Sequence, residues 1–315
     1  MTPGASSPTV GVAIPTRDRP EFLAETIESV LAGTRVPESL QVVDNSQRDP
    51  AVTESICRKF GSRVTYLAPV GDLSMQHNHN RAIQGTTTDL TCILHDDDLY
   101  GPHFLERGVR ALADDPSADL FAVNYEAIDE QGDLLLARSR NDFPVGSVTP
   151  LQFLEYAMGG RSPIHLSASI LRTAAAQRCA LAEVDENCAD MGFFFQLMSR
   201  ANAVLLDEPL VSVRVHRGME SAKAGFHRFG AKRESQVLPI APLEWQTKDR
   251  FLRSLLAETT LGESRAQLRK AAASRAIHLL LREARERTLP LSERLRLIRA
   301  AAQIVAETRR RWTAA

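Results

Sequence analysis

The chain has 315 residues, 43% of them apolar, which is enough to bury a core in one large domain or in one domain with an appendage. Its formal net charge of −1 and its aromatic content of 6% argue against a nucleic-acid partner. The four cysteines show no CxxC spacing, no apolar run reaches 18 residues, and the first eight residues do not resemble a signal peptide. We therefore expect a cytoplasmic protein without a disulfide framework, a zinc cluster or a membrane-spanning helix.

Short apolar runs alternate with amphipathic segments over the first 125 residues. Near-continuous apolar runs are typical of strands buried on both faces, and they predict strands at residues 10–14, 40–43, 64–67, 90–94 and 120–123. Apolar residues at helical spacing predict helices at residues 20–32, 51–60, 75–84 and 102–112. This alternation predicts an α/β fold with a mainly parallel sheet and helices on both faces.

The second half of the chain is less regular. The pattern predicts a hairpin at 129–136, a helix at 190–202, a strand at 210–215 and a mobile loop at 217–242. From residue 243 onward the pattern is helical. One apolar stripe recurs at helical spacing on the last helix, formed by Leu291, Leu295, Ile298, Ala302 and Val305.

The strongest chemical signal is the run His95-Asp96-Asp97-Asp98, directly after the predicted strand at 90–94. Ligands bind at the carboxyl ends of strands in a parallel α/β sheet. Three adjacent carboxylates repel one another unless a cation is present, and oxygen ligands suit Mg²⁺ or Mn²⁺, which also bind phosphate oxygens. The alternative is a solvated acidic loop that leads into the next helix.

The ends of the first two strands form a second feature. Pro15, Thr16 and Arg17 follow the first strand, and Asp44 follows the second. A carboxylate at a strand end can accept the imide N–H of uracil or thymine, and Thr16 with backbone groups could complete recognition of the base. Ordinary turn chemistry explains the same residue types.

Three further places hold polar residues that either bind a ligand or have a plain structural role. Asn78 and Asn80 lie within reach of a ligand or on a solvated helix face. Asp190, at the start of an apolar helix, is a candidate general base or a helix N-cap. His216 ends the last strand and is a candidate contact for a metal or a phosphate, or an ordinary histidine.

Taken in chain order, these segments resemble the family 2 glycosyltransferases of the GT-A fold. The resemblance covers residues 8–220 and rests on the segments 10–20, 25–31, 41–46, 78–83, 94–98, 190 and 210–216. The N-x-N pair and the LHDDD run are similar to one subgroup of that family. The chain departs from the family at His95, where the family often has Asp, and at Ala189, where it often has Glu.

The resemblance implies an inverting, metal-dependent transfer of a sugar from a UDP- or dTDP-sugar to an acceptor hydroxyl or amine. It implies that Asp44 binds the base, with Pro15, Thr16 and Arg17 nearby, and that Asp190 is the general base. The remaining implied roles are donor contacts at Asn78, Asn80 and Asp96, and ligation of Mn²⁺ or Mg²⁺ by Asp97, Asp98 and His216. Outside the resemblance, we expect residues 221–242 to form a mobile loop that either closes over the diphosphate or is a flexible surface loop with scattered charge. We expect residues 243–315 to form a basic helical C-terminal extension.

Two other functions compete with transfer. A nucleotidyltransferase that makes the sugar nucleotide normally has a Gly-rich loop after the first strand, and residues 15–19 contain no glycine. A catalytically silent nucleotide-sugar-binding module is disfavoured by Asp97 and Asp190 but favoured by Ala189.

Charge is unevenly distributed along the chain. Residues 241–315 carry 16 basic and 8 acidic residues, a net charge of +8, while the other 240 residues have a net charge of −9. The basic extension has three interpretations. It packs on the acidic part of the chain or on a second copy, it rests peripherally on an anionic membrane, or it shapes the site for an acceptor such as a glycan, a lipid-linked glycan or a small natural product.

Overall fold

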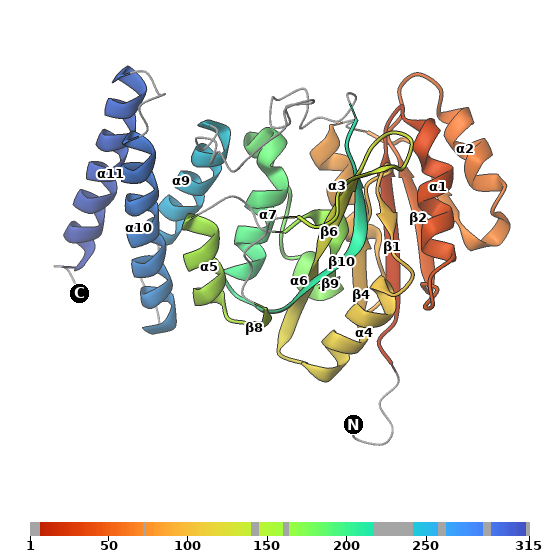
Figure 1. Cartoon of the computed structure of the whole chain (residues 1–315), viewed down its shortest axis with the longest axis horizontal. Coiled ribbons are helices and arrows are strands. Elements are labelled where there is room, and N and C mark those ends of the chain that lie inside the picture. The colour runs from red at the N-terminus through yellow and green to blue at the C-terminus, as the bar shows by residue number, and fades with distance from the viewer. Residues whose placement is uncertain are drawn as a thin grey trace.

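The computed structural model describes residues 7–71, 74–139, 145–159, 164–216, 242–257, 263–285 and 291–312. Its strands are β1 (Val10–Thr16), β2 (Ser39–Asp44), β3 (Thr65–Leu67), β4 (Leu90–Ile93), β5 (Leu99–Tyr100), β6 (Ala118–Ile128), β7 (Leu134–Leu136), β8 (Gly146–Val148), β9 (Ser169–Arg172) and β10 (Asn202–Arg214). They form one curled sheet in the order β3-β2-β1-β4-β9-β6-β10-β5, with β7 beside β6 and β8 beside β10 (Figure 1).

Helices cover both faces of this sheet (Figure 1). They are α1 (Pro20–Leu31), α2 (Pro50–Arg58), α3 (Met75–Gly85), α4 (Phe104–Asp114), α5 (Pro150–Gly159), α6 (Thr173–Ala176), α7 (Ala189–Met198), α9 (Pro242–Ala257), α10 (Glu263–Ala284) and α11 (Leu291–Trp312). The strands and helices predicted for the first 125 residues are confirmed to within a few residues at their ends, and β6 with β7 forms the predicted hairpin.

The longer strands all run in one direction. β1 is parallel to β2 and β4, β2 is parallel to β3, and β10 is parallel to β6. The short strand β9 lies between β4 and β6 and is antiparallel to both, so β6 points the same way as β4. The predicted mainly parallel α/β sheet is confirmed, and the carboxyl ends of β1, β2, β4, β6 and β10 lie along one edge.

Side chains alternate between two apolar cores, one on each face of the sheet. In β1, Val12 and Ile14 enter the core formed with α1, α2 and α4, whereas Ala13 enters the core on the opposite face. In β6, Phe121 and Leu120 divide in the same way. Because both faces are covered, most positions of these strands are apolar, which explains the near-continuous apolar runs in the sequence.

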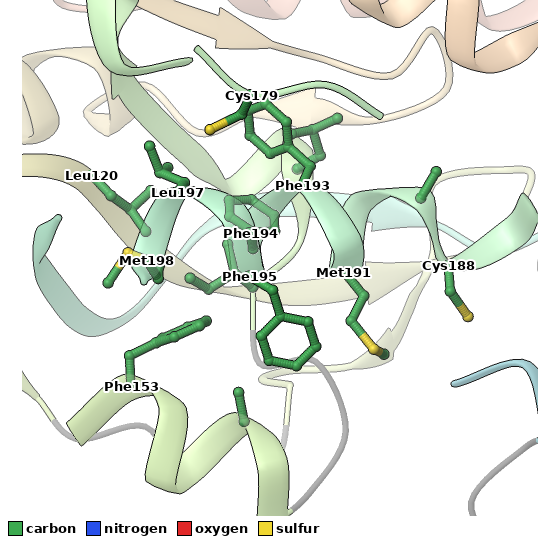
Figure 2. Close-up of a cluster of buried hydrophobic side chains, with 14 of the residues drawn as sticks. Leu120, Phe153, Cys179, Cys188, Met191, Phe193, Phe194, Phe195, Leu197 and Met198 are labelled. Carbon is green, nitrogen blue, oxygen red and sulfur yellow. The ribbon is translucent and has the colours of Figure 1, made fainter. Parts of the chain in front are cut away.

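The larger core is built around α7. Its Phe193, Phe194 and Phe195 are at most 2% exposed, and Figure 2 shows them packed together with Phe153 of α5. A helix that is apolar on all sides must be buried on all sides. Helix α9 closes one side of it, since the ring of Phe251 stacks on that of Phe195 with 4.8 Å between centroids.

The C-terminal helices extend this same core. Leu252 of α9, Ala276 and Leu280 of α10, and Leu297 of α11 belong to one continuous buried cluster with α7. Helix α10 packs on α5, and α11 packs on α10 as the outermost helix, far from α1 and α2 (Figure 1). The basic extension therefore packs on the rest of its own chain. None of the helices in the described ranges is long and apolar enough to cross a membrane.

The apolar stripe predicted on the last helix is not its packing face. Leu291, Leu295 and Ile298 are 69%, 43% and 45% exposed, while Leu297 and Ile304 are buried against α10. Both sets recur at helical spacing, so periodicity alone could not choose between them. Contact of the basic extension with an anionic membrane or with a second copy stays a prediction.

Strand β10 differs from its prediction. It begins at Asn202, where the sequence predicts the end of a helix, and α7 already ends at Met198. Pro209 obscured this strand, because proline cannot donate to a ladder, and the register shifts on both sides of it accommodate the missing hydrogen bond. Residues 217–241 of the predicted mobile loop lie outside the described ranges, and residue 242 already begins α9.

The two faces of α11 give a stability prediction. We expect Leu297→Ala to lower the free energy of unfolding by about 2–5 kcal/mol, because it leaves a cavity in the core. Leu295→Ala, the matched control two residues away, should change it by at most about 0.5 kcal/mol. Urea denaturation of the full chain measures both, and a larger loss in the Leu295 variant would contradict the packing of α11.

Candidate functional site

Polar side chains gather where the parallel strands end. β1 ends at Thr16 and β2 ends at Asp44. The acidic turn, residues 95–98, follows β4, and His216 follows β10. Because parallel strands end at the same edge, segments far apart in the sequence converge there, which is where open α/β sheets bind ligands. The structure thus brings together four of the segments predicted to carry function.

Asp96 and Asp97 share one arginine. Asp96 is fully buried, with Oδ2 accepting a hydrogen bond from Thr16 Oγ1 at 2.7 Å and Oδ1 lying 2.9 Å from Arg19 Nη2. Asp97 Oδ2 accepts hydrogen bonds from Arg19 Nη1 and from His216 Nε2, both at 2.9 Å. The forked guanidinium of Arg19 therefore bridges the two carboxylates.

The pKa values of the two carboxyls shift in opposite directions. Burial raises the pKa of Asp96 against the opposing charge of Arg19, and the charge of Asp97 adds to the rise. Burial also acts to raise the pKa of Asp97, but the hydrogen bond from His216 and the charge of Arg19 outweigh it and lower the pKa. One arginine is thus insufficient for two buried carboxylates, and a further cation would be favourable here.

Asp97 and His216 fit a divalent cation. They offer a carboxylate oxygen and an imidazole nitrogen 2.9 Å apart, and both are only 5% exposed. This donor set suits Mn²⁺, while an all-oxygen set would suit Mg²⁺ better. Two of the three predicted metal ligands therefore lie together.

Asp98, the third predicted metal ligand, has other contacts. Its Oδ1 accepts a hydrogen bond from the backbone N–H of Arg214 at 3.0 Å, and its Oδ2 accepts one from Ser167 Oγ at 2.6 Å. The Nδ1 atoms of His95 and His165 lie 3.5 Å and 3.8 Å from the same Oδ2. Adjacent residues of the acidic turn are thus divided between two sets of partners.

Arg214 holds the acidic turn in place. Its side chain is 1% exposed, and Nε donates to the carbonyl oxygen of Asp97 at 3.0 Å. Nη1 donates to the carbonyl oxygens of Asp129 and Glu130, and Nη2 pairs with Glu25 Oε2 at 2.7 Å. The turn after β4, the end of β6 and helix α1 are thereby joined through one buried cation.

The carboxylate of Asp44 is oriented by two donors. Its Oδ1 accepts from the backbone N–H of Ser46 and its Oδ2 from the hydroxyl of Tyr66, each at 2.8 Å. Burial and then this hydrogen bond raise the pKa of Tyr66, so the phenol remains a donor. The sheet register pairs Asp44 with Thr16, whose hydroxyl is already bonded to Asp96. Of the two residues beside Thr16, Pro15 is buried in β1 and Arg17 is exposed.

The amides of Asn78 and Asn80 form internal hydrogen bonds. Asn78 Nδ2 donates to the carbonyl oxygens of Val43 at 2.8 Å and Thr16 at 3.4 Å, which ties the ends of β1 and β2 together. Asn80 exchanges two hydrogen bonds of 2.8 Å with the backbone of Leu181. Both side chains therefore brace the segments around the site.

Asp190 lies in the first turn of α7, whose cap position is occupied by Cys188, so the alternative role of Asp190 as the N-cap is wrong. Its Oδ1 accepts from the N–H of Met191 at 2.7 Å. Burial raises the pKa of Tyr125, and the charges of Asp98 and Asp190 raise it further. The charges of Asp98 and Asp190 thus both influence the phenol of Tyr125.

Helix α9 holds the segment before Asp190. Asp185 is buried, and its Oδ1 accepts from Thr247 Oγ1 and from Arg250 Nε, both at 3.1 Å, with a second bond from Arg250 Nη2. The other oxygen of Asp185 lies against Gly192 of α7 so closely that a Cβ there would overlap it. The extension therefore contacts the first turns of the helix that carries Asp190.

Sequence reasoning gave no role to several residues of the site. They are Arg19, Tyr66, His165, Ser167 and Asp185. Arg19 lies beside a predicted helix start, but its pairing with two carboxylates depends on the fold. His165 and Ser167 come from a region without periodicity, so no signal in the sequence could identify them.

Comparisons with known proteins agree with this geometry. Residues 11–167 match the family model described as Glycosyl transferase family 2. A protein of Rickettsia felis, described as an uncharacterized glycosyltransferase, is 28% identical over 130 residues, which are 41% of this chain and 21% of that protein. The chain thus matches about a fifth of the length of this relative.

Solved structures share the fold at low identity. S. aureus TarS 1-349 gives a TM-score of 0.64 at 14% identity, covering 95% of this chain and 81% of that chain. The same protein in complex with UDP-GlcNAc gives 0.64 at 16%, with the same coverage. The mannosyltransferase PcManGT from Pyrobaculum calidifontis, in complex with GDP-Man and Mn²⁺, gives 0.54 at 13%, covering 98% of this chain and 88% of that chain.

The contact between Asp185 and α7 predicts a difference between two helical glycines. Gly192→Ala should cost about 1–3 kcal/mol of the free energy of unfolding, because the new methyl group overlaps the Asp185 carboxylate. Gly85→Ala, at the exposed last residue of α3, meets only an ordinary contact and should stabilise the chain by about 0.4–1 kcal/mol. Chemical denaturation measures both, and an unchanged stability of the Gly192 variant would contradict this packing.

Proposed function

We propose that the chain, whose residues 11–167 match the model of glycosyl transferase family 2, is an inverting, metal-dependent glycosyltransferase. It transfers a sugar from a UDP- or dTDP-sugar to a hydroxyl or amine of its acceptor. The observation that carries the proposal is the pair of buried carboxylates, Asp96 and Asp97, which Arg19 and His216 hold at the carboxyl edge of the sheet. Such a pair suits a ligand that combines phosphate oxygens with a cation.

A nucleotide sugar is the donor. Two of the similar structures are complexes with UDP-GlcNAc and with GDP-Man, which supports this class of ligand. Asp44 accepts the imide N–H that uracil and thymine both present and that cytosine lacks. Pro15, Thr16 and Arg17 shape the neighbouring strand end, and Asn78 fixes the spacing between that end and Asp44.

The diphosphate lies over the acidic turn. Asp97 and His216 would hold Mn²⁺ or Mg²⁺, while Asp98, next in the turn, is bonded to Arg214 and Ser167 instead. Such a cation neutralises the charge that develops on the leaving diphosphate. Asp96 is fixed by Thr16 and Arg19 and faces the ribose and diphosphate. Asn80 supports the donor from the adjoining segment through its two bonds to Leu181.

Asp190 removes the proton of the acceptor. Its carboxylate is partly exposed at the first turn of α7, and its charge, like that of Asp98, helps to raise the pKa of Tyr125. One carboxylate base, with Ala189 in the preceding position, favours a single in-line displacement with inversion at the sugar carbon. General base catalysis of this kind contributes about 10²–10⁴-fold.

The acceptor binds beside α7. Helix α9 of the extension holds the segment before Asp190, which supports the interpretation that the extension shapes the acceptor site. The acceptor classes that fit are glycans, lipid-linked glycans and small natural products, each of which offers a hydroxyl or an amine.

Turnover of a donor panel tests the proposal. We expect one UDP- or dTDP-sugar, but no GDP-sugar, to release its nucleoside diphosphate slowly in the presence of Mn²⁺. Asp190→Asn should lower transfer to an acceptor by about 10²–10⁴-fold while nucleotide binding is kept. Asp97→Ala should abolish the Mn²⁺-dependent release of nucleoside diphosphate. The exposed Asp114→Asn is the matched control and should leave the rates unchanged.

Three outcomes would contradict transfer. Absence of nucleotide binding in calorimetry with Mn²⁺ would refute the donor site. Binding without turnover of any donor, in the presence of a panel of acceptors, would indicate a silent binding module. Formation of a sugar nucleotide from a sugar phosphate and a nucleoside triphosphate would indicate a nucleotidyltransferase.

The role of Asp44 predicts a change in base selectivity. Asp44→Asn should weaken UDP binding roughly 10- to 100-fold, the value of a hydrogen bond to a charged group, and should weaken CDP binding less. Tyr66→Phe, which removes only the hydroxyl that orients Asp44, should have a smaller effect on UDP. Calorimetry with both nucleotides measures this, and equal losses for UDP and CDP would contradict a contact between Asp44 and the base.

A further inference from the structure

We propose that His95, Asp98 and His165 form a second divalent-cation site, which takes a transition-metal ion such as Zn²⁺ and is separate from the site at Asp97 and His216. One potential ligand atom from each of the three lies within 4.8 Å of the other two. The inference goes beyond the proposed function, since this site does not require a nucleotide.

The distances between the imidazole nitrogens and the Asp98 carboxylate fit ligands of a shared metal ion better than they fit direct hydrogen bonds. Nδ1 of His95 and Nδ1 of His165 both lie near one oxygen, Oδ2 of Asp98, at 3.5 Å and 3.8 Å. These distances are long for N–H···O bonds. Ligand atoms bound to one tetrahedral Zn²⁺ at about 2.0–2.2 Å lie roughly 3.3–3.6 Å apart, so small movements of the rings would complete the site.

The charge of Asp98 provides a second argument. Among the residues that the structure describes, its close hydrogen-bond donors are neutral, namely the backbone N–H of Arg214 and the hydroxyl of Ser167. The carboxylate is 1% exposed, and a buried charge requires a counter-charge. A proton on one imidazole would supply a single long hydrogen bond, whereas an ion would satisfy both nitrogens and the carboxylate together.

The three ligands are held by a common framework. Ser167 Oγ donates to Asp98 Oδ2 at 2.6 Å and accepts from the backbone N–H of His95 at 3.1 Å. The ring of His95 packs edge-on against those of His79 and His165, at 5.5 Å and 5.1 Å between centroids. Supporting contacts of this kind orient metal ligands before an ion binds.

The chemistry of the ligands selects the ion. Two imidazoles and one carboxylate favour Zn²⁺ and related transition metals over Mg²⁺. The side chains of His95 and His165 are 29% and 23% exposed, so the site opens to solvent on one side. A water molecule or an oxygen of a bound substrate would complete the coordination there.

Metal titration of the full chain tests the proposal. After removal of metals with a chelator, the chain without nucleotide should bind one equivalent of Zn²⁺ in calorimetry. Co²⁺ should give the visible absorption of a four-coordinate site with imidazole ligands. His165→Gln should weaken Zn²⁺ binding at least tenfold and remove the Co²⁺ band, because one of three protein ligands is lost.

Two matched variants separate this site from its neighbours. His216→Gln, which alters the site at Asp97, should leave the Zn²⁺ equivalent unchanged, as should His278→Gln on the exposed face of α10. Circular dichroism checks that each variant is folded.

Equal Zn²⁺ uptake by the wild type and the His165 variant would overturn the proposal. So would a loss of binding confined to His216→Gln, or an absence of Zn²⁺ binding by the folded wild type. These results are independent of the proposed function, which fails instead if no nucleotide sugar binds or reacts.

Discussion

The arrangement of the candidate site depends on burying the guanidinium of Arg214. An unpaired cation at that depth would be prohibitively costly, so the chain must bring acceptors to it from every side. Those acceptors come from the turn after β4, from the end of β6 and from α1, through Asp97, Asp129, Glu130 and Glu25. One side chain thereby fixes the acidic turn relative to three elements that are distant in sequence. The position of the carboxylates is therefore a consequence of the fold closing around this charge.

Three consecutive acids can be buried in this turn because each has its own partners. Asp96 takes a hydroxyl and one arm of Arg19, Asp97 takes the other arm and His216, and Asp98 takes Ser167 and a backbone N–H. Burial raises the pKa of Asp96, so its partners do not fully offset the cost of its charge, whereas His216 and Arg19 lower the pKa of Asp97. An edge that carries more buried negative charge than its own cations balance is suited to bind metal ions and phosphate groups together.

The sequence predicts the part of the fold that depends on burial of both sheet faces. The runs that became β1, β2 and β4 are apolar at nearly every position, and their ends locate Thr16, Asp44 and the acidic turn. Strand β9 was not predicted, although it lies in the middle of the sheet, because Ser169–Arg172 is only four residues long and leads directly into a short helix. Its position is determined by pairing with β4 and β6, and this pairing cannot be predicted from the local sequence of β9.

The residues of the candidate site also fall into a group that the sequence predicts and a group that it does not. Residues next to a predicted strand end could be assigned from the sequence, because topology alone brings them to one edge. The partners that determine their chemistry could not, since Arg19, His165 and Ser167 reach the carboxylates through tertiary packing. A similar limit applies to α11, where two faces have the same period and the fit to the alanines of α10 decides which is buried.

The start of the C-terminal extension is physically continuous with the helix that carries Asp190. Two successive residues of α9 have separate contacts there: Arg250 binds Asp185, and the ring of Phe251 stacks on Phe195. Asp185 in turn abuts the second residue after Asp190. A displacement of α9 would therefore be transmitted to the first turns of α7 through these packed contacts. The composition shift near residue 243 marks a change in charge, while the buried core runs across it without interruption.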